Sequence, residues 1–279
     1  MTRTRTGDTF LGIDFSGDRK MWLPSRESNV YIASVSVSAG GLVLDSLTTV
    51  QDLPGDGLPF DRLAHLLGKR DFRAAAIDAP FSVPSSHMPS GGHKKLLSMV
   101  ASLGQPENSQ FPSAQDFVCR VLAGTELKAK KPFRETEREW ANRKVNVRST
   151  LWAGPRGGAA MTAACLTLLE QAKCPIWPWS SSDEDGLLVE AFPAGQLCHW
   201  GMPYESYNGP EDVKRVNRQR IIEGLSKRIE LGTECRSTME TSADALDAVV
   251  CVFAAFAVTA GKLAQQTTKS DEGQIAIHI

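Results

Sequence analysis

The sequence predicts an α/β fold in which helices cover the faces of a mixed sheet. Three observations support this prediction. Short apolar runs alternate along the chain with segments whose apolar residues recur at helical spacing. The runs at 9–14, 30–37 and 42–50 come first and close together, as in an antiparallel meander. The later runs at 74–78 and 187–192 are separated by helical segments, which indicates parallel strands joined by crossovers.

The first run is a short buried strand that ends in a carboxylate. Apolar residues and glycine continue from Phe10 to Ile13, and Asp14 stands where the run stops. Ser16 and Gly17 then provide a turn. An acid at the end of a core strand is costly unless it is solvated, hydrogen-bonded or bound to a cation. The alternative is that Asp14 only caps this turn through its own backbone.

The middle of the chain changes character after the fourth predicted strand. A helix is predicted over 58–67, and the strand at 74–78 ends at Asp78 before Pro80. Periodicity then weakens, with only short helical pieces near 94–103 and 114–122. We therefore expect residues 84–150 to form an insertion or a cover over an active site.

Regular patterns return in the second half. Helices are predicted over 157–172, 211–230 and 241–260, and residues 274–279 alternate like a terminal edge strand. Three hairpin-linked strands followed by crossovers are typical of the RNase H-like fold. We expect one such domain over residues 1–279.

Composition limits the possible classes of protein. The chain has 279 residues, 42% of them apolar, and a formal net charge of −1, so any surface for nucleic acid must be local. None of the six cysteines has C-x-x-C spacing, and scattered cysteines suit a reducing compartment. The longest apolar run, 248–258, is too short to span a bilayer as a helix. We expect a cytoplasmic protein that does not contact membranes.

Acidic residues recur at the ends of the predicted apolar elements. Asp78 and Glu190 repeat the placement of Asp14, while Asp244 and Asp247 are three residues apart and so share a helix face. Carboxylates brought together raise one another's pKa unless a cation compensates. Mg²⁺ or Mn²⁺ suits such oxygen ligands, and two such ions roughly 4 Å apart can promote phosphodiester hydrolysis.

Each acid also has a structural explanation. Asp244 could complete a capping box with Thr241, and Asp78 could cap a turn before Ala79-Pro80. Glu190 could pair with a buried arginine. Asp247 is harder to explain in this way, because it lies one turn deeper among apolar neighbours.

Short motifs follow one another in order over most of the chain, namely Gly12–Gly17, Ala76–Phe81, Phe133–Glu137, Val189–Pro193, Asp244–Ala248 and a closing stretch at Glu272–Ile277. Through these motifs the chain resembles the predicted nucleases of RNase H-like fold known as domain of unknown function 429. The resemblance implies an acidic metal site at Asp14, Asp78, Glu190 and Asp247, and nuclease activity. We expect Asp244 to assist these four residues.

A basic segment provides candidates for substrate binding. Residues 128–148 contain eight Lys or Arg, with Phe133 and Trp140 among them. Such a segment could hold a phosphate backbone and stack on bases, or it could be a solvated helix. The candidate ligands are Arg134, Lys131 and Arg138, together with Arg156 in a glycine-rich turn that precedes a helix and could hold a phosphate.

The sequence therefore favours a Mg²⁺- or Mn²⁺-dependent nuclease or phosphodiesterase that acts on DNA or RNA. Two alternatives remain open. The first is an actin-like ATPase or kinase, which shares the strand order but needs a second glycine-rich phosphate hairpin. The second is a non-catalytic module that binds nucleic acid or protein and retains the acidic site.

Overall fold

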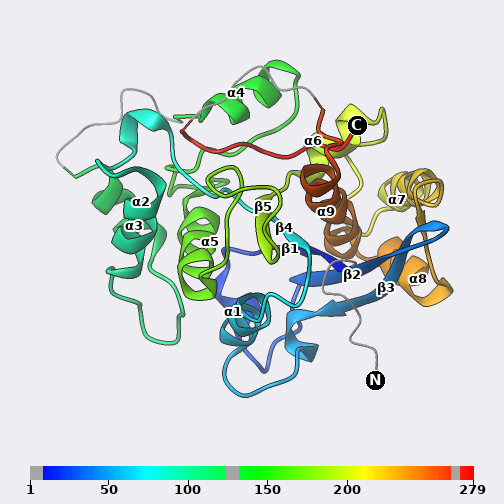
Figure 1. The fold of residues 1–279 in the computed structure, drawn as a ribbon, viewed down its shortest axis with the longest axis horizontal. Coiled ribbons are helices and arrows are strands. Elements are labelled where there is room, and N and C mark those ends of the chain that lie inside the picture. The colour runs from blue at the N-terminus through cyan, green and yellow to red at the C-terminus, as the bar shows by residue number, and fades with distance from the viewer. Residues whose placement is uncertain (1–8, 124–131, 265–270) are drawn as a thin grey trace.

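The computed structural model describes residues 9–123, 132–264 and 271–279 (Figure 1). The strands of the described chain are β1 Thr9–Asp14, β2 Tyr31–Ser38, β3 Gly41–Thr49, β4 Ala74–Asp78, β5 Leu187–Glu190 and β6 Ile229–Glu230. The α-helices are α1 Pro59–Gly68, α2 Gly92–Ala101, α3 Ala114–Val121, α4 Glu135–Asn142, α5 Ala159–Ala172, α6 Pro193–His199, α7 Asp212–Leu225, α8 Thr233–Thr241 and α9 Ala243–Ala260. Short 3₁₀ helices occupy Arg19–Trp22, Val50–Asp52 and Ser85–His87.

All six strands form one mixed sheet in the order β5-β4-β1-β2-β3-β6. The strands β1, β2 and β3 pair antiparallel, whereas β4 and β5 continue the sheet parallel to β1. The two-residue β6 pairs parallel with β3 at the opposite edge. These pairings confirm the predicted α/β fold with an antiparallel meander and parallel strands.

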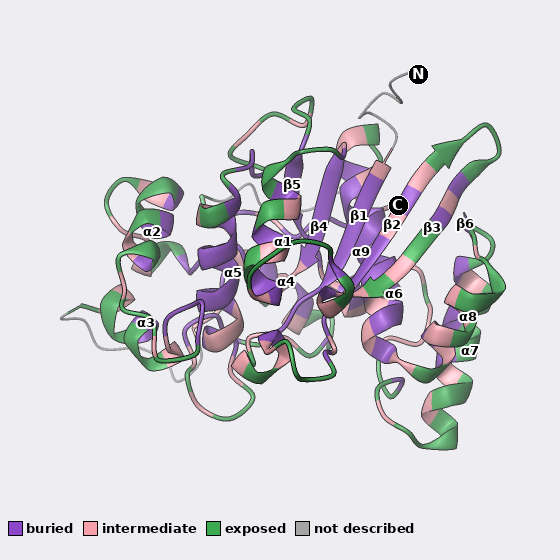
Figure 2. Ribbon diagram, turned by 90° about the horizontal axis from the view of Figure 1, so that it is seen from below, coloured by how far each residue is buried: buried purple, intermediate pink, exposed green. Residues whose placement is uncertain are grey.

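Helices cover both faces of the sheet (Figure 1), and β1, β4 and β5 are buried between them, whereas much of β3 is exposed (Figure 2). Successive side chains of a strand point to opposite faces. Phe10, Ala76 and Val189 therefore pack in the core cluster on the α9 side. Ile13 and Ile77 pack in the other cluster, together with α1 and α5. Asp14 and Asp78 follow these isoleucines, so strand alternation directs both carboxylates to the α9 side.

Close packing of β1 against α9 depends on a glycine. A Cβ atom at Gly12 would lie 2.1 Å from the carbonyl oxygen of Ala248. Gly17, in the loop after β1, is similarly close to α5, since its Cβ would lie 2.4 Å from the backbone nitrogen of Met161. The two glycines thus bring both helices against the strand and loop that carry Asp14.

Helix α9 is the central helix of the core. By length and composition it could cross a membrane, with a mean hydropathy of 1.9, but 72% of it is buried inside the protein. The capping box considered as an alternative role for Asp244, with Thr241, does not form. Instead, Thr241 ends α8, and Ser242 accepts a hydrogen bond from the backbone N–H of Ala245.

Several elements differ from the sequence prediction. The helix predicted over 211–230 ends at Leu225, and the chain continues into β6. Helices α6 and α8 were not predicted. Residues 274–279 do not form a sheet strand, since only His278 makes a bridge, to Leu263. The backbone N–H of Ala276 nevertheless donates to the carbonyl oxygen of Glu190, which ties this segment to the end of β5.

The segment predicted as an insertion, residues 84–150, has two parts that pack against different elements. Helices α2 and α3 pack against α5. The part around α4 lies beside the C-terminal segment, and Trp140 and Val145 pack against Ile275 and Ile277 in a third small core cluster. Residues 134–148 thereby reach the carboxyl ends of β4 and β5, where they form part of a cleft.

Candidate active site

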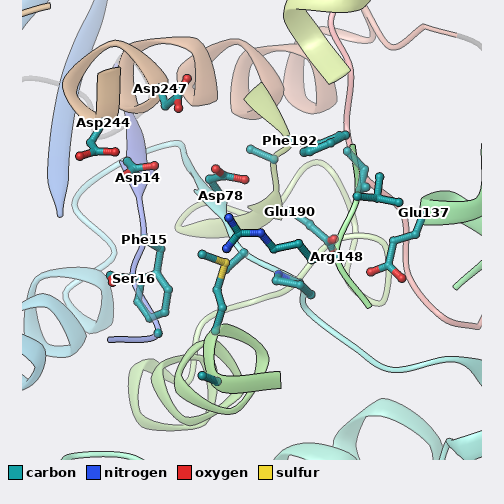
Figure 3. A pocket seen from close by; sticks show the side chains of 18 of the residues that line it. Asp14, Phe15, Ser16, Asp78, Glu137, Arg148, Glu190, Phe192, Asp244 and Asp247 are labelled. Atoms are coloured by element: carbon teal, nitrogen blue, oxygen red, sulfur yellow. The ribbon is translucent and has the colours of Figure 1, made fainter. Parts of the chain in front are cut away.

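A cleft of about 610 Å³ opens at the carboxyl ends of β1, β4 and β5. Carboxylates from five elements line it. Asp14 ends β1, Asp78 ends β4, and Asp244 and Asp247 lie in the first turns of α9, while Glu190 of β5 and Glu137 of α4 line the other side (Figure 3). The structure therefore brings all five acids singled out in the sequence to one cleft, four of them on the side of the sheet that α9 covers.

Strand register places Asp14 and Asp78 side by side. They are direct partners in the parallel pairing of β1 and β4, and adjacent strands lie about 4.8 Å apart. Burial raises the pKa of Asp14 well above its usual value, and Asp247, Asp78 and Asp244 raise it further. Burial likewise raises the pKa of Asp78 to about 7, aided by Glu190 and opposed by the guanidinium of Arg148.

The acids of α9 are held by neighbouring polar side chains. The Tyr207 hydroxyl donates a 2.9 Å hydrogen bond to Oδ1 of Asp247. Burial raises the pKa of Asp247, as does Asp78, while this hydrogen bond lowers it. Burial also raises the pKa of Asp244, and a hydrogen bond from Asn29 opposes that change. Each of these neighbours therefore stabilises the ionised form of its partner.

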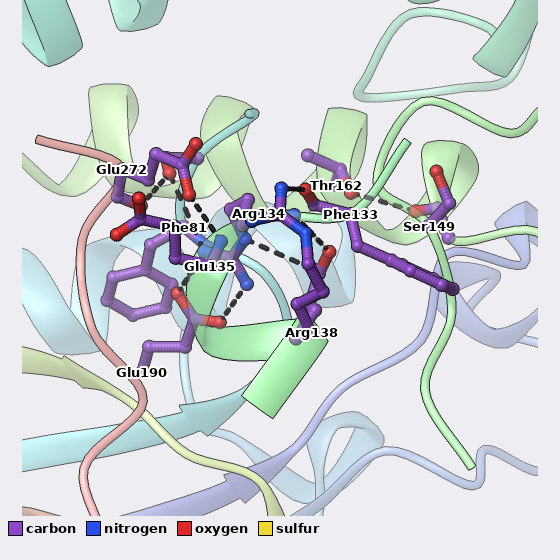
Figure 4. A network of polar contacts seen from close by, with 12 residues as sticks. Phe81, Phe133, Arg134, Glu135, Arg138, Ser149, Thr162, Glu190 and Glu272 are labelled. Atoms are coloured by element: carbon purple, nitrogen blue, oxygen red, sulfur yellow. Dashed lines mark hydrogen bonds and ion pairs between the residues drawn. The ribbon is translucent and has the colours of Figure 1, made fainter. Parts of the chain in front are cut away.

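Glu190 lines the same cleft from the other side of the sheet, and its register explains why. It pairs with Ile77 rather than with Asp78, so its side chain leaves the sheet on the α5 side, opposite to Asp14 and Asp78. There it forms a buried ion pair with Arg134, whose Nη1 donates to Oε2 of Glu190 over 2.8 Å and whose Nη2 donates to Oε1 (Figure 4). The alternative considered from the sequence, a buried arginine partner for Glu190, is thus present.

Arg134 is a structural cation rather than a surface one. Its side chain is 1% exposed and also donates from Nε to Glu137 over 3.1 Å. Burial alone would lower the pKa of Arg134, but Glu190 and Glu137 outweigh burial and raise it. Burial raises the pKa of Glu137 to about 7, against the lowering effect of Arg134. Arg134 lines the cleft as well, so its predicted contact with substrate phosphate stays a prediction beside this structural role.

The same network holds surrounding segments together. The backbone N–H of Phe81 donates to Oε2 of Glu190 over 3.0 Å. Glu272 accepts from the backbone N–H groups of Ser85 and Glu135, each over 2.5 Å (Figure 4). The loop after β4, the start of α4 and the C-terminal segment thus meet around buried carboxylates.

The other predicted substrate ligands lie away from the cleft or outside the described residues. Arg138 is exposed and donates to the carbonyl oxygen of Phe133. Arg156 is exposed in a turn and does not line the cleft. The amides of Gly157 and Gly158 in that turn donate to carbonyl oxygens of the same loop, so they are not available to a phosphate. Lys131 falls outside the described residues.

The donors of the cleft suit an open site for a hard divalent cation. Within the described residues, no three His, Cys, Asp or Glu side chains converge closely enough to hold one ion. Mg²⁺ is usually bound by only one or two carboxylates plus water and substrate phosphate, so a closed cage is not required. Asn29 lines the cleft, and its buried Oδ1 has no hydrogen-bond partner. This oxygen is a further ligand of the kind that such a cation prefers.

Sequence reasoning missed three polar contributors to the cleft, namely Asn29, Tyr207 and Arg148. Asn29 and Tyr207 lie in connections without periodicity, and neither stands near Asp14, Asp78, Asp244 or Asp247 in the sequence. Arg148 was counted in the basic segment but not singled out. Its position after α4 offered no signal that it would face Asp78 (Figure 3).

Comparison with known proteins identifies the family. The model of the family described as "Protein of unknown function (DUF429)" matches residues 12–272, and the chain belongs to this family. No curated protein and no solved structure matches the chain.

Proposed function

We propose that the protein is a divalent-metal-dependent nuclease or phosphodiesterase. One observation carries this proposal: Asp14, Asp78, Asp244 and Asp247 line one cleft, and none of them forms an ion pair with a described residue. Like charges held together in a partly buried site favour binding of an external cation. Mg²⁺ or Mn²⁺ matches the oxygen donors.

The strand order supports an RNase H-like assignment of the fold. From β3 to β5 the order is β3-β2-β1-β4-β5, with an antiparallel meander followed by parallel strands. Asp14 stands at the carboxyl end of β1, the central strand of this order, and Asp78 at the carboxyl end of the adjacent β4. Ligands of open α/β sheets commonly bind at such strand ends.

The chain's own residues have distinct proposed roles. Asp14 and Asp78 would hold the cation, with Asp244, Asp247 and Asn29 beside them and Tyr207 fixing Asp247. When bound, the cation polarises a phosphoryl oxygen and lowers the pKa of water. Glu190 is reassigned from metal ligand to support, because Arg134 already occupies both of its oxygens.

A cleavage assay tests this function. Purified wild type would be incubated with single- and double-stranded DNA and RNA in Mg²⁺, Mn²⁺ or EDTA. We expect cleavage that requires metal and falls about 100-fold or more in Asp14→Asn. Asp56→Asn, in an exposed loop, is the matched control and should cleave like wild type.

Full turnover by Asp14→Asn would refute the site. Salt-sensitive binding without cleavage, unchanged in Asp14→Asn, would favour a binding module instead.

A further inference from the structure

The cleft has a second half that differs in chemistry from the acidic half. Beyond Asp78, the lining includes Arg148 and then Phe192, on the side away from Asp14 and Asp244 (Figure 3). The arrangement therefore runs from carboxylates through a cation to an aromatic ring. Neither Arg148 nor Phe192 has a role in the proposed cation site.

Arg148 is a cation available to a ligand. It is exposed, its guanidinium points toward Asp78, and it makes no hydrogen bond or ion pair with a described residue (Figure 3). By contrast, Arg134, also in the lining, is occupied by Glu190 and Glu137. A guanidinium presents a planar fork of N–H donors that matches a phosphate group. Arg148 is thus positioned to hold a phosphate next to the acids.

Phe192 is an aromatic surface with a fixed orientation. Its ring packs edge-on against Trp140, with the centroids 6.0 Å apart. A Cβ at Gly195 would lie 2.6 Å from the Phe192 ring, so the glycine makes room for it. Trp140 is itself covered by the guanidinium of Arg143, 4.7 Å from the ring centroid. These contacts hold one side of Phe192 while the residue lines the cleft.

We propose that this half of the cleft binds one nucleotide unit, with its phosphate on Arg148 and its base against Phe192. The inference rests on the proposed function and names its substrate class. Aromatic side chains stack on any base. Arg148 is the only unpaired cation among the described lining residues, whereas a tract of polymer backbone requires several phosphate contacts. A cleft of about 610 Å³ accommodates a small ligand rather than a duplex.

The nucleotide could be free in solution or be an unpaired nucleotide of a strand. Isothermal titration calorimetry separates these sources with three probes: thymidine 5′-monophosphate, deoxyribose 5-phosphate and a single-stranded oligothymidylate. Each is titrated into the full chain with Mg²⁺ present. Equal affinity for the monophosphate and the oligothymidylate indicates a free nucleotide. Affinity about 10-fold or more higher for the oligothymidylate indicates a strand.

The variants test each contact separately. Arg148→Ala should weaken binding of thymidine 5′-monophosphate and deoxyribose 5-phosphate alike, by about 10- to 100-fold. Phe192→Leu should weaken only the nucleotide, by about 10-fold. Arg120→Ala, exposed on α3 and outside the cleft lining, is the control and should match wild type. Unchanged affinity in Arg148→Ala, or equal wild-type affinity for the two monophosphate probes, would overturn the inference.

The cleavage assay distinguishes this inference from the proposed function. If Asp14→Asn abolishes cleavage but Arg148→Ala binds thymidine 5′-monophosphate with full affinity, the proposed hydrolase is supported and the nucleotide site is refuted. If no cleavage occurs but Arg148→Ala and Phe192→Leu lose affinity as predicted, the nucleotide site is supported and the hydrolase is refuted.

Discussion

At the scale of the residue, Asp14 and Asp78 show how the end of a buried strand changes the pKa of a carboxyl group. Each follows an apolar run, and parallel pairing makes them neighbours. Burial then raises the pKa of both groups, and neighbouring carboxylates raise it further. The folded protein thus retains a destabilising arrangement, which is common where function requires it.

The pKa of Asp78 predicts a pH-dependent stability in the absence of metal. The pKa is raised from 3.8 to about 7 on folding. Between these values the folded chain holds a proton that the unfolded chain has released, so the free energy of unfolding falls as pH rises. Since Asp78 is partly exposed, we expect Asp78→Asn to raise the free energy of unfolding at pH 8 by roughly 1–2 kcal/mol.

Urea denaturation at several pH values in EDTA measures this effect. The gain in Asp78→Asn should shrink as the pH falls below about 7 and vanish only below the unfolded pKa of 3.8, where the wild-type carboxyl is protonated in both states. Asp56→Asn, in an exposed loop, should show neither the gain nor its pH dependence. A destabilised Asp78→Asn at pH 8 would contradict the assigned pKa.

Replacement of Arg134 should lower the free energy of unfolding, in contrast to Asp78→Asn. Arg134→Met leaves Glu190 and Glu137 buried without their cation, so we expect a loss of roughly 3–5 kcal/mol in the free energy of unfolding. Arg134→Lys should recover only part of this, because lysine cannot make the paired contacts to Glu190. Denaturant unfolding measures both. Arg138→Ala, exposed one turn later, should change stability by less than about 0.5 kcal/mol, and an equal loss there would contradict the assignment.

Residue patterns could identify the acids but not their partners. Apolar runs that end in Asp14, Asp78 and Glu190 look alike in the sequence. Their directions differ because Glu190 pairs with Ile77, one residue before Asp78. A one-residue offset in register reverses the face of a side chain. Register depends on tertiary pairing, so the sequence alone could not separate Glu190 from the other acids.

At the scale of the element, contact between β1 and α9 determines how closely the acids approach. Gly12→Ala would place Cβ 2.1 Å from the carbonyl oxygen of Ala248, and strand and helix would have to separate. We expect a loss of roughly 2 kcal/mol or more in the free energy of unfolding, from overpacking. Gly40→Ala is the control, because its Cβ would meet only Ser38 Oγ at 3.7 Å.

Thermal unfolding of the two glycine variants provides the measurement. The midpoint should fall clearly in Gly12→Ala and remain near wild type in Gly40→Ala. A wild-type midpoint in Gly12→Ala would show that the strand and helix are not held as tightly as the contact indicates.

Long periodic elements were predictable, whereas short ones were not. The five longer strands and helices α1, α5 and α9 follow clear apolar periods. In contrast, β6 has two residues and α6 has seven, too few for a period to emerge. Helices α8 and α9 are separated only by Ser242. The sequence predicts the second helix from residue 241, because no turn residue marks the break between them.

At the scale of the whole molecule, the cleft is assembled from segments that are distant in sequence. Asp14 comes from the start of the chain and Ile275 from near its end. The C-terminal segment contributes Glu272 to the buried network and Ile277 to the cluster around Trp140. This segment therefore connects α4 with the loop after β4.

Removal of residues 272–279 tests that connection. We expect a loss of roughly 3 kcal/mol or more, because apolar burial and two hydrogen bonds to Glu272 disappear. Hydrogen exchange should rise in α4 first, since α4 loses its partner cluster. Ile279→Ala, 60% exposed, is the control and should leave exchange unchanged. Unchanged exchange in α4 of the shortened chain would contradict this role.

The most direct test of the central claim is Mn²⁺ binding, measured by electron paramagnetic resonance of the metal-free protein during titration. The acidic cleft predicts saturable binding in wild type that weakens about 10-fold or more in both Asp14→Asn and Asp78→Asn, while Asp56→Asn binds like wild type. Absence of saturable binding in wild type, or equal affinity in all three variants, would contradict the account.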